Sequence, residues 1–313
     1  MNFIVFPGQG SQKIRMGKDL SDNFIEAKEV FEEVNESLDY NLTKIMWGDD
    51  EKALSLTYNA QPALMACGVA SFRVLKKITG KTLPQLADYV CGHSLGEYTA
   101  MTVSEVFSLK ECSKLLRLRG NAMQKAVPVG KGAMAAFIGA DISTILDILK
   151  QVQSFGVCDI ANDNSDGQVV ISGDLEAVEN AINLTKQYGI KRAVLLPVSA
   201  PFHCRLMQPA QLTMEEALNN LEFQQPILPI ISNINAEPET DPNKLRINLI
   251  DQVTGTVKWR ETMLLAKKLG VQKITELGSG KVLTGIAKRM IENVSILNIE
   301  NSADLKVFYS FKI

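Results

Sequence analysis

Residues 90–97, with the sequence VCGHSLGE, place a serine in a pattern that suits a nucleophile. Ser94 lies in a Gly-x-Ser-x-Gly turn between a strand-like run at 87–90 and a helical stretch. The two glycines allow a tight turn, and the helix directs its first N–H groups toward any oxyanion that forms beside Ser94. An ordinary strand-to-helix turn with an inert serine is the alternative, but the flanking elements that the motif requires favour a nucleophile.

A serine hydroxyl needs a base before it attacks an acyl carbon at neutral pH, and the chain has two histidines. His93 directly precedes Ser94, so we expect its side chain to project away from the hydroxyl and to support the loop. His203, in the run PFHC at 201–204, is then the candidate general base. A core histidine satisfied by hydrogen bonds is the alternative, and it is favoured only where no serine motif is present.

The elements that must position these two residues follow from the apolar periodicity. The loop after the first expected strand, PGQGSQ, has two glycines, but Lys13 stands where a dinucleotide-binding fingerprint has its third. The loop is therefore weak support for a dinucleotide-binding fold. In the parts of the chain before residue 129 and after residue 198, we expect strands at 3–6, 87–90, 227–232 and 273–276, and helices at 19–39, 61–80, 109–123, 207–219, 244–252, 261–269 and 282–290.

Residues 129–198 have a different pattern, which indicates an inserted unit. The order of elements, βαββαβ, is that of a small ferredoxin-like unit. We therefore predict an α/β protein in which 129–198 form a small subdomain, inserted into a large subdomain made of 1–128 and 199–313. Within the insertion we expect strands at 133–139, 157–162, 168–172 and 193–197, helices at 142–152 and 175–188, and a polar turn, NDNSDG, at 162–167.

The composition is that of an ordinary globular protein, with 313 residues, 46% hydrophobic and 22% charged. This length exceeds the usual size of a single core, which agrees with two unequal parts. The net charge of -2 gives no overall attraction to nucleic acid or to an anionic membrane. The apolar start ends at Pro7, and no later apolar run reaches membrane-spanning length. The five cysteines are scattered without Cys-x-x-Cys spacing, which favours reduced thiols in the cytoplasm and argues against a metal site.

Six short motifs occur in order along nearly the whole chain. They are FPGQGSQ (6–12), QPA (61–63), GHSLGEY (92–98), RG (119–120), GQVVISG (167–173) and PFH (201–203). Each motif alone is modest support for any assignment. The ordered set is highly specific, and it resembles the malonyl-CoA:acyl-carrier-protein transacylase family.

The resemblance implies an α/β-hydrolase-like large subdomain and a ferredoxin-like small one. It also implies a ping-pong transfer of malonyl from malonyl-CoA to the phosphopantetheine thiol of an acyl carrier protein, with no metal or redox cofactor. The transfer would supply fatty-acid synthesis, or alternatively polyketide assembly. The implied roles are Ser94 as nucleophile, His203 as its base, the backbone N–H groups of Gln9 and Leu95 as oxyanion donors, Arg119 as partner of the malonyl carboxylate, Gln61 and Phe202 as lining residues, and the backbone carbonyl of Gln252 as the group that orients His203.

Phe202 beside the base would narrow the acyl pocket, as in the malonyl-selective rather than the methylmalonyl-selective members of the family. The chain departs from the family pattern at two places. Ser279 stands where proline is common in a Gly-Pro-Gly turn, which puts the stiffness of that loop in doubt. The tail Leu305–Ile313 matches nothing in the family pattern.

Carrier proteins of this type are strongly acidic, so a nearly neutral enzyme would have to bind them through a local basic surface. The candidate residues are Lys110, Lys114, Arg117 and Lys125, near Arg119 in the sequence, together with Lys281, Lys288 and Arg289. For any one of these lysines and arginines, the alternative is an ordinary solvated helix face.

Two other functions compete with acyl transfer. A serine hydrolase would use water as the acceptor and would carry an acidic residue between Ser94 and His203, whereas the small subdomain occupies that interval and Arg119 would have no purpose. A non-catalytic module that binds carrier proteins is the second, and the presence of Ser94, His203 and Arg119 argues against it.

Overall fold

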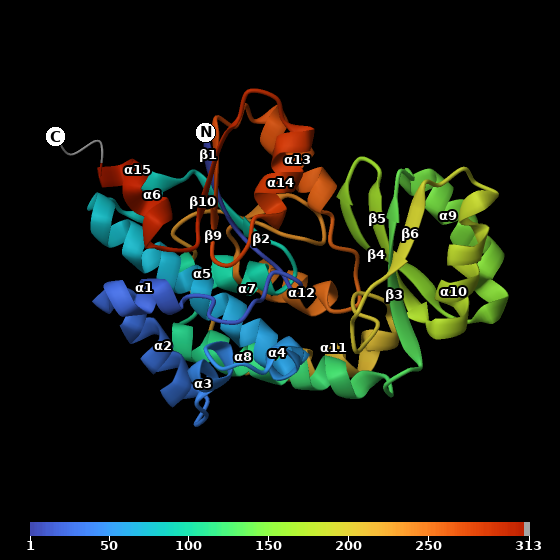
Figure 1. Ribbon diagram of the computed structural model, residues 1–313, viewed down its shortest axis with the longest axis horizontal. Helices are drawn as coiled ribbons and strands as arrows, with labels where there is room; N and C mark the ends of the chain where they lie inside the picture. The colour runs from blue at the N-terminus through green and yellow to red at the C-terminus, as the bar shows by residue number, and fades with distance from the viewer. Residues whose placement is uncertain (310–313) are drawn as a thin grey trace.

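Two β-sheets organise the chain in the computed structural model, which describes residues 1–309 (Figure 1). The larger sheet has six strands, of which all neighbours from β10 to β7 run parallel, while β8 is antiparallel to β7. In sheet order the strands are β10 (Ser295–Ile299), β9 (Lys273–Leu277), β1 (Asn2–Phe6), β2 (Tyr89–Gly92), β7 (Ile230–Ile231) and β8 (Pro238–Glu239).

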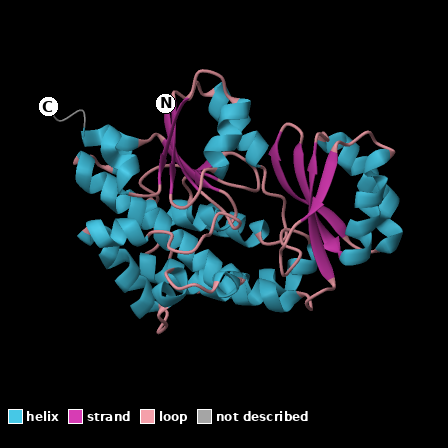
Figure 2. Ribbon diagram, in the orientation of Figure 1, coloured by secondary structure: helices cyan, strands magenta, loops and turns pink. Residues whose placement is uncertain are grey.

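Helices cover both faces of the larger sheet (Figure 2). The sequence of strand β1 explains this arrangement. Ile4 and Phe6 pack into one core with α5 and α7, whereas Phe3 and Val5 pack into another with α13 and α14. Side chains alternate along a strand, so an uninterrupted apolar strand must be buried on both sides. The helices are α1 (Lys18–Asn23), α2 (Ile25–Ser37), α3 (Leu42–Met46), α4 (Glu51–Ser55), α5 (Thr57–Thr79), α6 (Leu83–Leu86), α7 (Leu95–Val103), α8 (Leu109–Ala126), α11 (Gln208–Asn219), α12 (Pro242–Gln252), α13 (Trp259–Lys268), α14 (Val282–Met290) and α15 (Lys306–Tyr309).

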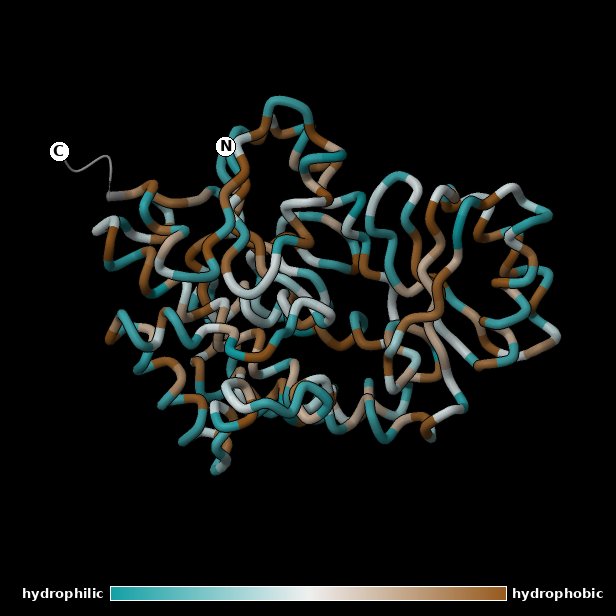
Figure 3. The backbone as a smooth tube through the Cα atoms, viewed as in Figure 1, coloured by the Kyte–Doolittle hydropathy of each residue, from teal (hydrophilic) through white to brown (hydrophobic). Residues whose placement is uncertain are grey.

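The smaller sheet is antiparallel, with strand order β4-β5-β3-β6. Ala135 and Phe137 of β3 pack toward the two helices of this unit, while Met134 points to the opposite face and joins the core of the larger part. Figure 3 shows hydrophobic stretches along the strands of both sheets. The elements, in chain order, are β3 (Gly132–Ile138), α9 (Ile142–Val152), β4 (Cys158–Ser165), β5 (Gln168–Asp174), α10 (Leu175–Asn183) and β6 (Arg192–Leu195). The predicted order of two helices and four strands in this region is confirmed.

Two predicted helices were too long. The helix expected at 19–39 is interrupted at Phe24, whose backbone is extended (φ -135°, ψ 126°) and whose ring packs against the core, so α1 and α2 are separate helices. The helix expected at 175–188 ends at Asn183 and continues as one 3₁₀ turn at Leu184–Lys186.

The structure also corrects two strand predictions. Residues 162–165, expected in a turn, belong to β4, because β4 pairs with β5 through two register shifts and Asp163 N–H also donates to the carbonyl of Val257 at 3.0 Å. Strand β10 was not expected, since its sequence SILNI has serine and asparagine among its five residues and gives no continuous apolar run. Within residues 1–309, no helix has the length and apolar character needed to cross a membrane.

Candidate active site

Ser94 lies at the sharp turn between β2 and α7, with φ 53° and ψ -112°. A positive φ is strained for a residue with a side chain, and such strain is typical of functional turns. The flanking glycines are required by space. A Cβ on Gly92 would lie 2.0 Å from the carbonyl of Gly96, and a Cβ on Gly96 would lie 2.3 Å from the carbonyl oxygen of Phe6.

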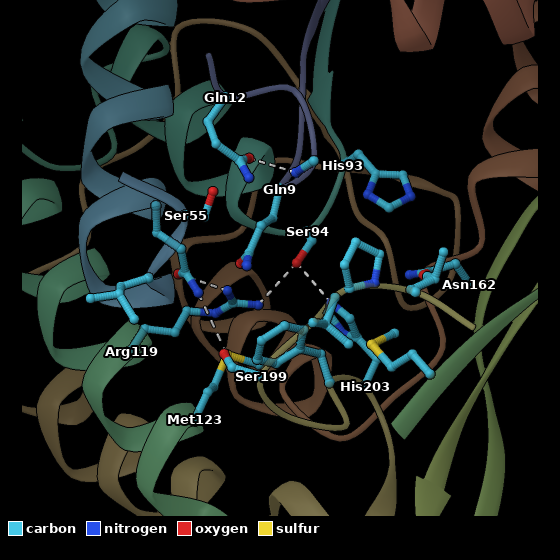
Figure 4. A pocket seen from close by; sticks show the side chains of 18 of the residues that line it. Gln9, Gln12, Ser55, His93, Ser94, Arg119, Met123, Asn162, Ser199 and His203 are labelled. Atoms are coloured by element: carbon cyan, nitrogen blue, oxygen red, sulfur yellow. Dashed lines mark hydrogen bonds between the residues drawn. The ribbon is translucent and has the colours of Figure 1, made fainter. Parts of the chain in front are cut away.

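The Ser94 hydroxyl contacts the ring of His203, with 2.7 Å between Oγ and Nε2 (Figure 4). Nδ1 of the same ring lies 2.8 Å from the carbonyl oxygen of Gln252. A carbonyl only accepts, so Nδ1 carries the proton and Nε2 is free to accept from the hydroxyl. The arrangement is therefore a serine–histidine pair oriented by a main-chain carbonyl, and both contacts match the sequence expectation.

The electrostatics of the pair favour a neutral imidazole. Burial, followed by the positive charge of Arg119, lowers the pKa of His203 to about 3. His93 takes no part in this contact: its Nε2 lies 2.8 Å from Oδ1 of Asn164 on β4, and its ring lies 5.7 Å from that of Trp259. Its side chain points away from Ser94, as expected (Figure 4).

Arg119 is buried beside the serine, and within residues 1–309 its hydrogen bonds go to neutral groups. Nη1 donates to Oε1 of Gln61 at 2.8 Å, and Nη2 donates to Oε1 of Gln252 at 2.9 Å and to Oγ of Ser94 at 3.2 Å. Its Nε has no partner within residues 1–309, and burial lowers its pKa. A buried cation without a carboxylate in contact is costly, which indicates a site for an anionic ligand.

Helix α8 brings Arg119 to this position by packing very closely on α5. Pro62 lies inside α5 and has no N–H to offer the carbonyl of Tyr58, one turn earlier. Arg117 fills that gap by donating to this carbonyl at 3.0 Å. A Cβ on Gly120 would lie 2.5 Å from Cα of Tyr58, so the two helices touch backbone to backbone there. Helix α5 begins at Thr57, four residues before the expected start at residue 61.

The two residues expected to supply oxyanion donors are Gln9, which lines the same cavity as Ser94, and Leu95, which follows Ser94 in the chain. Leu95 is the first residue of α7, and the N–H of Ser94 itself is occupied by Oδ1 of Asn233 at 2.7 Å. Neither the backbone N–H of Gln9 nor that of Leu95 has an acceptor among the described residues. Free N–H groups at a helix start are suited to bind a developing oxyanion.

A cavity of about 830 Å³ opens over the serine–histidine pair and lies between the two parts of the chain. Its polar wall includes Gln9, Gln61 and Arg119, whereas the smaller sheet and the segment after it supply an apolar wall. Phe202 lines the cavity beside His203, as expected. The apolar wall consists of Met134, Leu196, Pro197, Val198 and Phe202.

Sequence reasoning missed two buried residues of this site. Asn233 donates from Nδ2 to the carbonyl of Gly92 at 2.7 Å and accepts from Ser94 N–H. Its side chain therefore stabilises the turn that carries Ser94. Glu97, in the first turn of α7, accepts from Nε2 of Gln252 at 2.7 Å, and burial raises its pKa to about 7. The position of Asn233 just after a strand parallel to β2 was an available signal, because parallel strands end at one edge.

The expected basic surface is divided between two helices, α8 and α14, that lie apart in Figure 1. Arg117 is occupied by the rings of Tyr40 and Tyr58, each 4.7 Å away, and does not belong to it. The remaining candidates are exposed, but Lys110 lies about 20 Å along α8 from the end of that helix which reaches the cavity. The expectation that all these residues form one basic surface is therefore wrong.

The acyl transferase domain family matches residues 3–299. The malonyl CoA-acyl carrier protein transacylase of Haemophilus influenzae is 38% identical over 311 residues, which are 99% of this chain and 98% of the relative. The chain belongs to this transacylase family. An acyl-carrier-protein-S-malonyltransferase structure from Bartonella henselae has a TM-score of 0.95 and 47% identity, covering 98% of this chain and 99% of that one. A malonyl-transacylase solved with a type II PKS acyl-carrier protein has a TM-score of 0.94 and 38% identity, covering 99% of each chain.

The serine that departs from the transacylase pattern makes bonds that proline could not make. Oγ of Ser279 donates to the carbonyl of Ser11 at 2.7 Å and lies 3.2 Å from Oε1 of Glu300. Ser279 therefore fastens the loop that contains Gln9 to the end of β10. Of the tail 305–313, which carries none of the family motifs, Leu305 is buried, and residues 310–313 lie outside the described residues.

Proposed function

We propose that the chain transfers malonyl from malonyl-CoA to the phosphopantetheine thiol of an acyl carrier protein through a malonyl ester on Ser94. The observation that carries this proposal is the buried guanidinium of Arg119, bonded to neutral groups and 3.2 Å from Oγ of Ser94. The acyl group of malonyl-CoA ends in a carboxylate, which needs a fixed cation beside the reacting serine. The family relatives support the same substrate by name.

In the first half-reaction, Oγ of Ser94 attacks the thioester carbon while its proton passes to Nε2 of His203. The C–S bond then breaks, and His203 returns the proton to the CoA sulfur as it leaves. In the second half-reaction the carrier thiol gives its proton to His203 and attacks the ester, and Ser94 leaves with the proton restored. Only acyl and proton transfers occur, so the proposal includes no cofactor.

The other side chains are assigned to binding and charge stabilisation. The backbone N–H groups of Gln9 and Leu95 would stabilise the oxyanion of both tetrahedral intermediates, each donor being worth about 3 kcal/mol. Gln61 orients the guanidinium of Arg119, and Phe202 narrows the acyl pocket. The carbonyl of Gln252 keeps His203 in the tautomer that accepts from Ser94.

The architecture fits this division of roles. We assign residues 1–128 and 199–313 to an α/β-hydrolase-like subdomain that supplies the serine, histidine and arginine. Residues 129–198 are assigned to a ferredoxin-like subdomain that supplies the apolar wall. The element order βαββαβ and the strand order β4-β5-β3-β6 support the second assignment. A cytoplasmic location belongs to the proposal and rests on the sequence.

An assay with two acceptors tests the proposed function against hydrolysis. Malonyl-CoA is supplied with a fatty-acid carrier protein, with a polyketide carrier protein, and with neither, and CoA, malonate and malonyl-carrier protein are measured. We expect fast transfer to a carrier protein and slow release of malonate without one. Malonate release at rates that rival transfer would instead identify a hydrolase. The relative solved with a polyketide carrier protein is the reason for testing both carriers.

The part that His203 plays in acylation is expected to be insensitive to mild acid. Since the pKa of His203 is lowered to about 3, the ring stays neutral and able to accept a proton as the pH falls from about 8 to about 5. Glu97, whose pKa is raised to about 7, titrates in the same range, so the pH profile is measured in the Glu97→Gln variant. We expect kcat/KM for acylation of this variant by malonyl-CoA to show no fall centred near the ordinary histidine pKa of about 6.5. An acid limb near 6.5 in its single-turnover profile would contradict the assigned environment of His203.

Carrier-protein recognition is expected to depend on the exposed basic residues at the two ends of α14, Lys281, Lys288 and Arg289. Lys281 follows Gly280, which packs on the loop carrying Gln9, and Arg289 donates to Gln168 of the smaller sheet at 3.3 Å. Replacing Lys281 and Lys288 with glutamate should raise the KM for carrier protein about tenfold and weaken its salt dependence, with acylation by malonyl-CoA unchanged. The same replacement of Lys110 and Lys114 is the matched control. Equal effects of the two double variants would contradict the proposed surface.

A further inference from the structure

Glu97 is a buried carboxylate one turn after Ser94, and the proposed mechanism leaves it without a role. Its Oε2 accepts from Nε2 of Gln252 at 2.7 Å and from the backbone N–H of Asn233 at 3.2 Å. Its Oε1 makes no hydrogen bond of standard geometry among residues 1–309, although the hydroxyl of Ser232 faces this carboxyl group. Burying a carboxylate is unfavourable, so its presence at this place calls for a function in the site.

The side chain of Gln252 connects Glu97 to the acyl-binding cation. Nε2 of Gln252 donates toward Oε2 of Glu97, the carbonyl of Ser94 at 3.0 Å and Oδ1 of Asn233 at 3.3 Å. At the other end of the amide, Oε1 accepts from Nη2 of Arg119 at 2.9 Å. Nη2 is also the atom that lies 3.2 Å from Oγ of Ser94. One amide therefore bridges a buried carboxyl group and a buried cation.

The two ends of a glutamine amide have nearly the same shape, so their hydrogen-bond partners decide which way it faces. In the reverse orientation, Oε1 of Gln252 would face the oxygen of Glu97, and the NH₂ group would face the guanidinium of Arg119. Both contacts would be repulsive. Glu97 is the only ionisable acceptor among the three on the NH₂ side, and its contact is the shortest of them.

We propose that Glu97 is a positioning residue for substrate selection. By accepting from the NH₂ group of Gln252, it holds the amide oxygen toward Arg119 and thereby fixes the guanidinium beside Ser94 in the orientation that receives an acyl carboxylate. This inference rests on the proposed malonyl transfer. It predicts that Glu97 affects the choice between malonyl and acetyl thioesters, although its own atoms touch neither.

The test compares Glu97→Leu with Glu97→Gln by kcat/KM for acylation with malonyl-CoA and acetyl-CoA. Leucine fills the space but removes the shortest of the three contacts that hold the NH₂ group of Gln252, so the amide is held less firmly and the malonyl-to-acetyl ratio should fall about tenfold. Glutamine keeps an oxygen acceptor and can place its own NH₂ at the position of Oε1, where the hydroxyl of Ser232 faces the side chain. Glu97→Gln should therefore restore most of the ratio lost in Glu97→Leu.

A double-mutant cycle with Gln252→Met tests the connection itself. Methionine removes the amide and leaves the backbone carbonyl that orients His203. Gln252→Met should lower the malonyl-to-acetyl ratio as Glu97→Leu does, and the double variant should lose little more. Glu276→Gln is the matched control, because Glu276 is a buried glutamate that accepts from the N–H groups of Leu283 and Thr284, away from the cavity. It should lower the Tm and leave the ratio unchanged.

Three results would overturn the inference. In the first, Glu97→Leu keeps the wild-type ratio while its Tm falls, which assigns Glu97 to stability alone. In the second, Glu97→Gln loses as much of the ratio as Glu97→Leu, which assigns the effect to charge. In the third, Gln252→Met keeps the wild-type ratio, which decides the matter even if Glu97→Leu does not fold. Absence of malonyl transfer by the wild-type protein would instead overturn the proposed function.

Discussion

Acyl transfer by the Ser94→Ala variant is expected to fall about 10⁶-fold, and transfer by His203→Ala nearly as far. Alanine at position 94 removes the atom that forms the ester. Alanine at position 203 removes the base 2.7 Å from that atom and leaves the proton of the hydroxyl without an acceptor. The two variants should not add, because each removes the same step. Rapid-quench measurement of CoA release and of malonyl-carrier protein checks both half-reactions.

The His203→Ala variant decides whether this histidine is the base. Its affinity for CoA, measured by calorimetry, should stay near that of the wild type, since the ring contacts the serine and a main-chain carbonyl. Its Tm verifies that the buried site has not collapsed. Near-normal transfer by His203→Ala would contradict the pair. In that case the proton would have to pass to another group, and His93 would require reconsideration despite its contact with Asn164.

The Arg119→Ala variant is expected to lose most malonyl transfer and to gain relative activity with acetyl-CoA. Malonyl differs from acetyl by a terminal carboxylate, and the planar guanidinium can meet both oxygens of that group. An acetyl group leaves the buried cation unpaired, at a cost of about 3–5 kcal/mol, so the wild type should prefer malonyl by a hundredfold or more. Alanine removes both the attraction and the penalty. The ratio of kcat/KM for the two thioesters measures the change.

Two further variants separate charge, geometry and helix stability. Arg119→Lys keeps the charge but loses the fork, so its malonyl-to-acetyl ratio should lie between those of wild type and Arg119→Ala. Arg117→Ala is the matched control. It removes an arginine from the same helix, two residues earlier, whose contacts are with α5 and with Tyr40 rather than with the cavity. It should lower the Tm without changing the ratio. A wild-type ratio in Arg119→Ala would contradict the assigned acyl pocket.

Residues whose own side-chain chemistry does the work could be found from the sequence. Ser94 and His203 belong to short motifs that indicate a nucleophile and its base. Their contact at 2.7 Å requires only that the chain, after the inserted subdomain, comes back to the turn that carries Ser94. Asn233 and Glu97 could not be found in this way. Each acts through the partner that the fold supplies, Asn233 beneath the turn of Ser94 and Glu97 through the amide of Gln252.

The errors in the predicted elements have the same origin. The periodicity of 19–39 is continuous, yet Phe24 turns the chain because its ring has a place in the core. Residues 162–165 have turn-forming side chains, but they pair with β5 and with the backbone at Val257, and they are therefore part of a strand. Strand β10 has polar residues at Ser295 and Asn298 and is a strand because it pairs along β9. Tertiary contacts decided these three cases against local propensity.

Intact-protein mass spectrometry after addition of malonyl-CoA tests the central claim most directly. The protein is incubated without carrier protein and quenched in acid, with wild type and Ser94→Ala in parallel. We predict that the wild type gains one malonyl group, that peptide mapping places it on Ser94, and that later addition of carrier protein removes it. Ser94→Ala should gain none. A wild type that turns over malonyl-CoA without an adduct, or an adduct that persists in Ser94→Ala, would contradict a malonyl-serine intermediate.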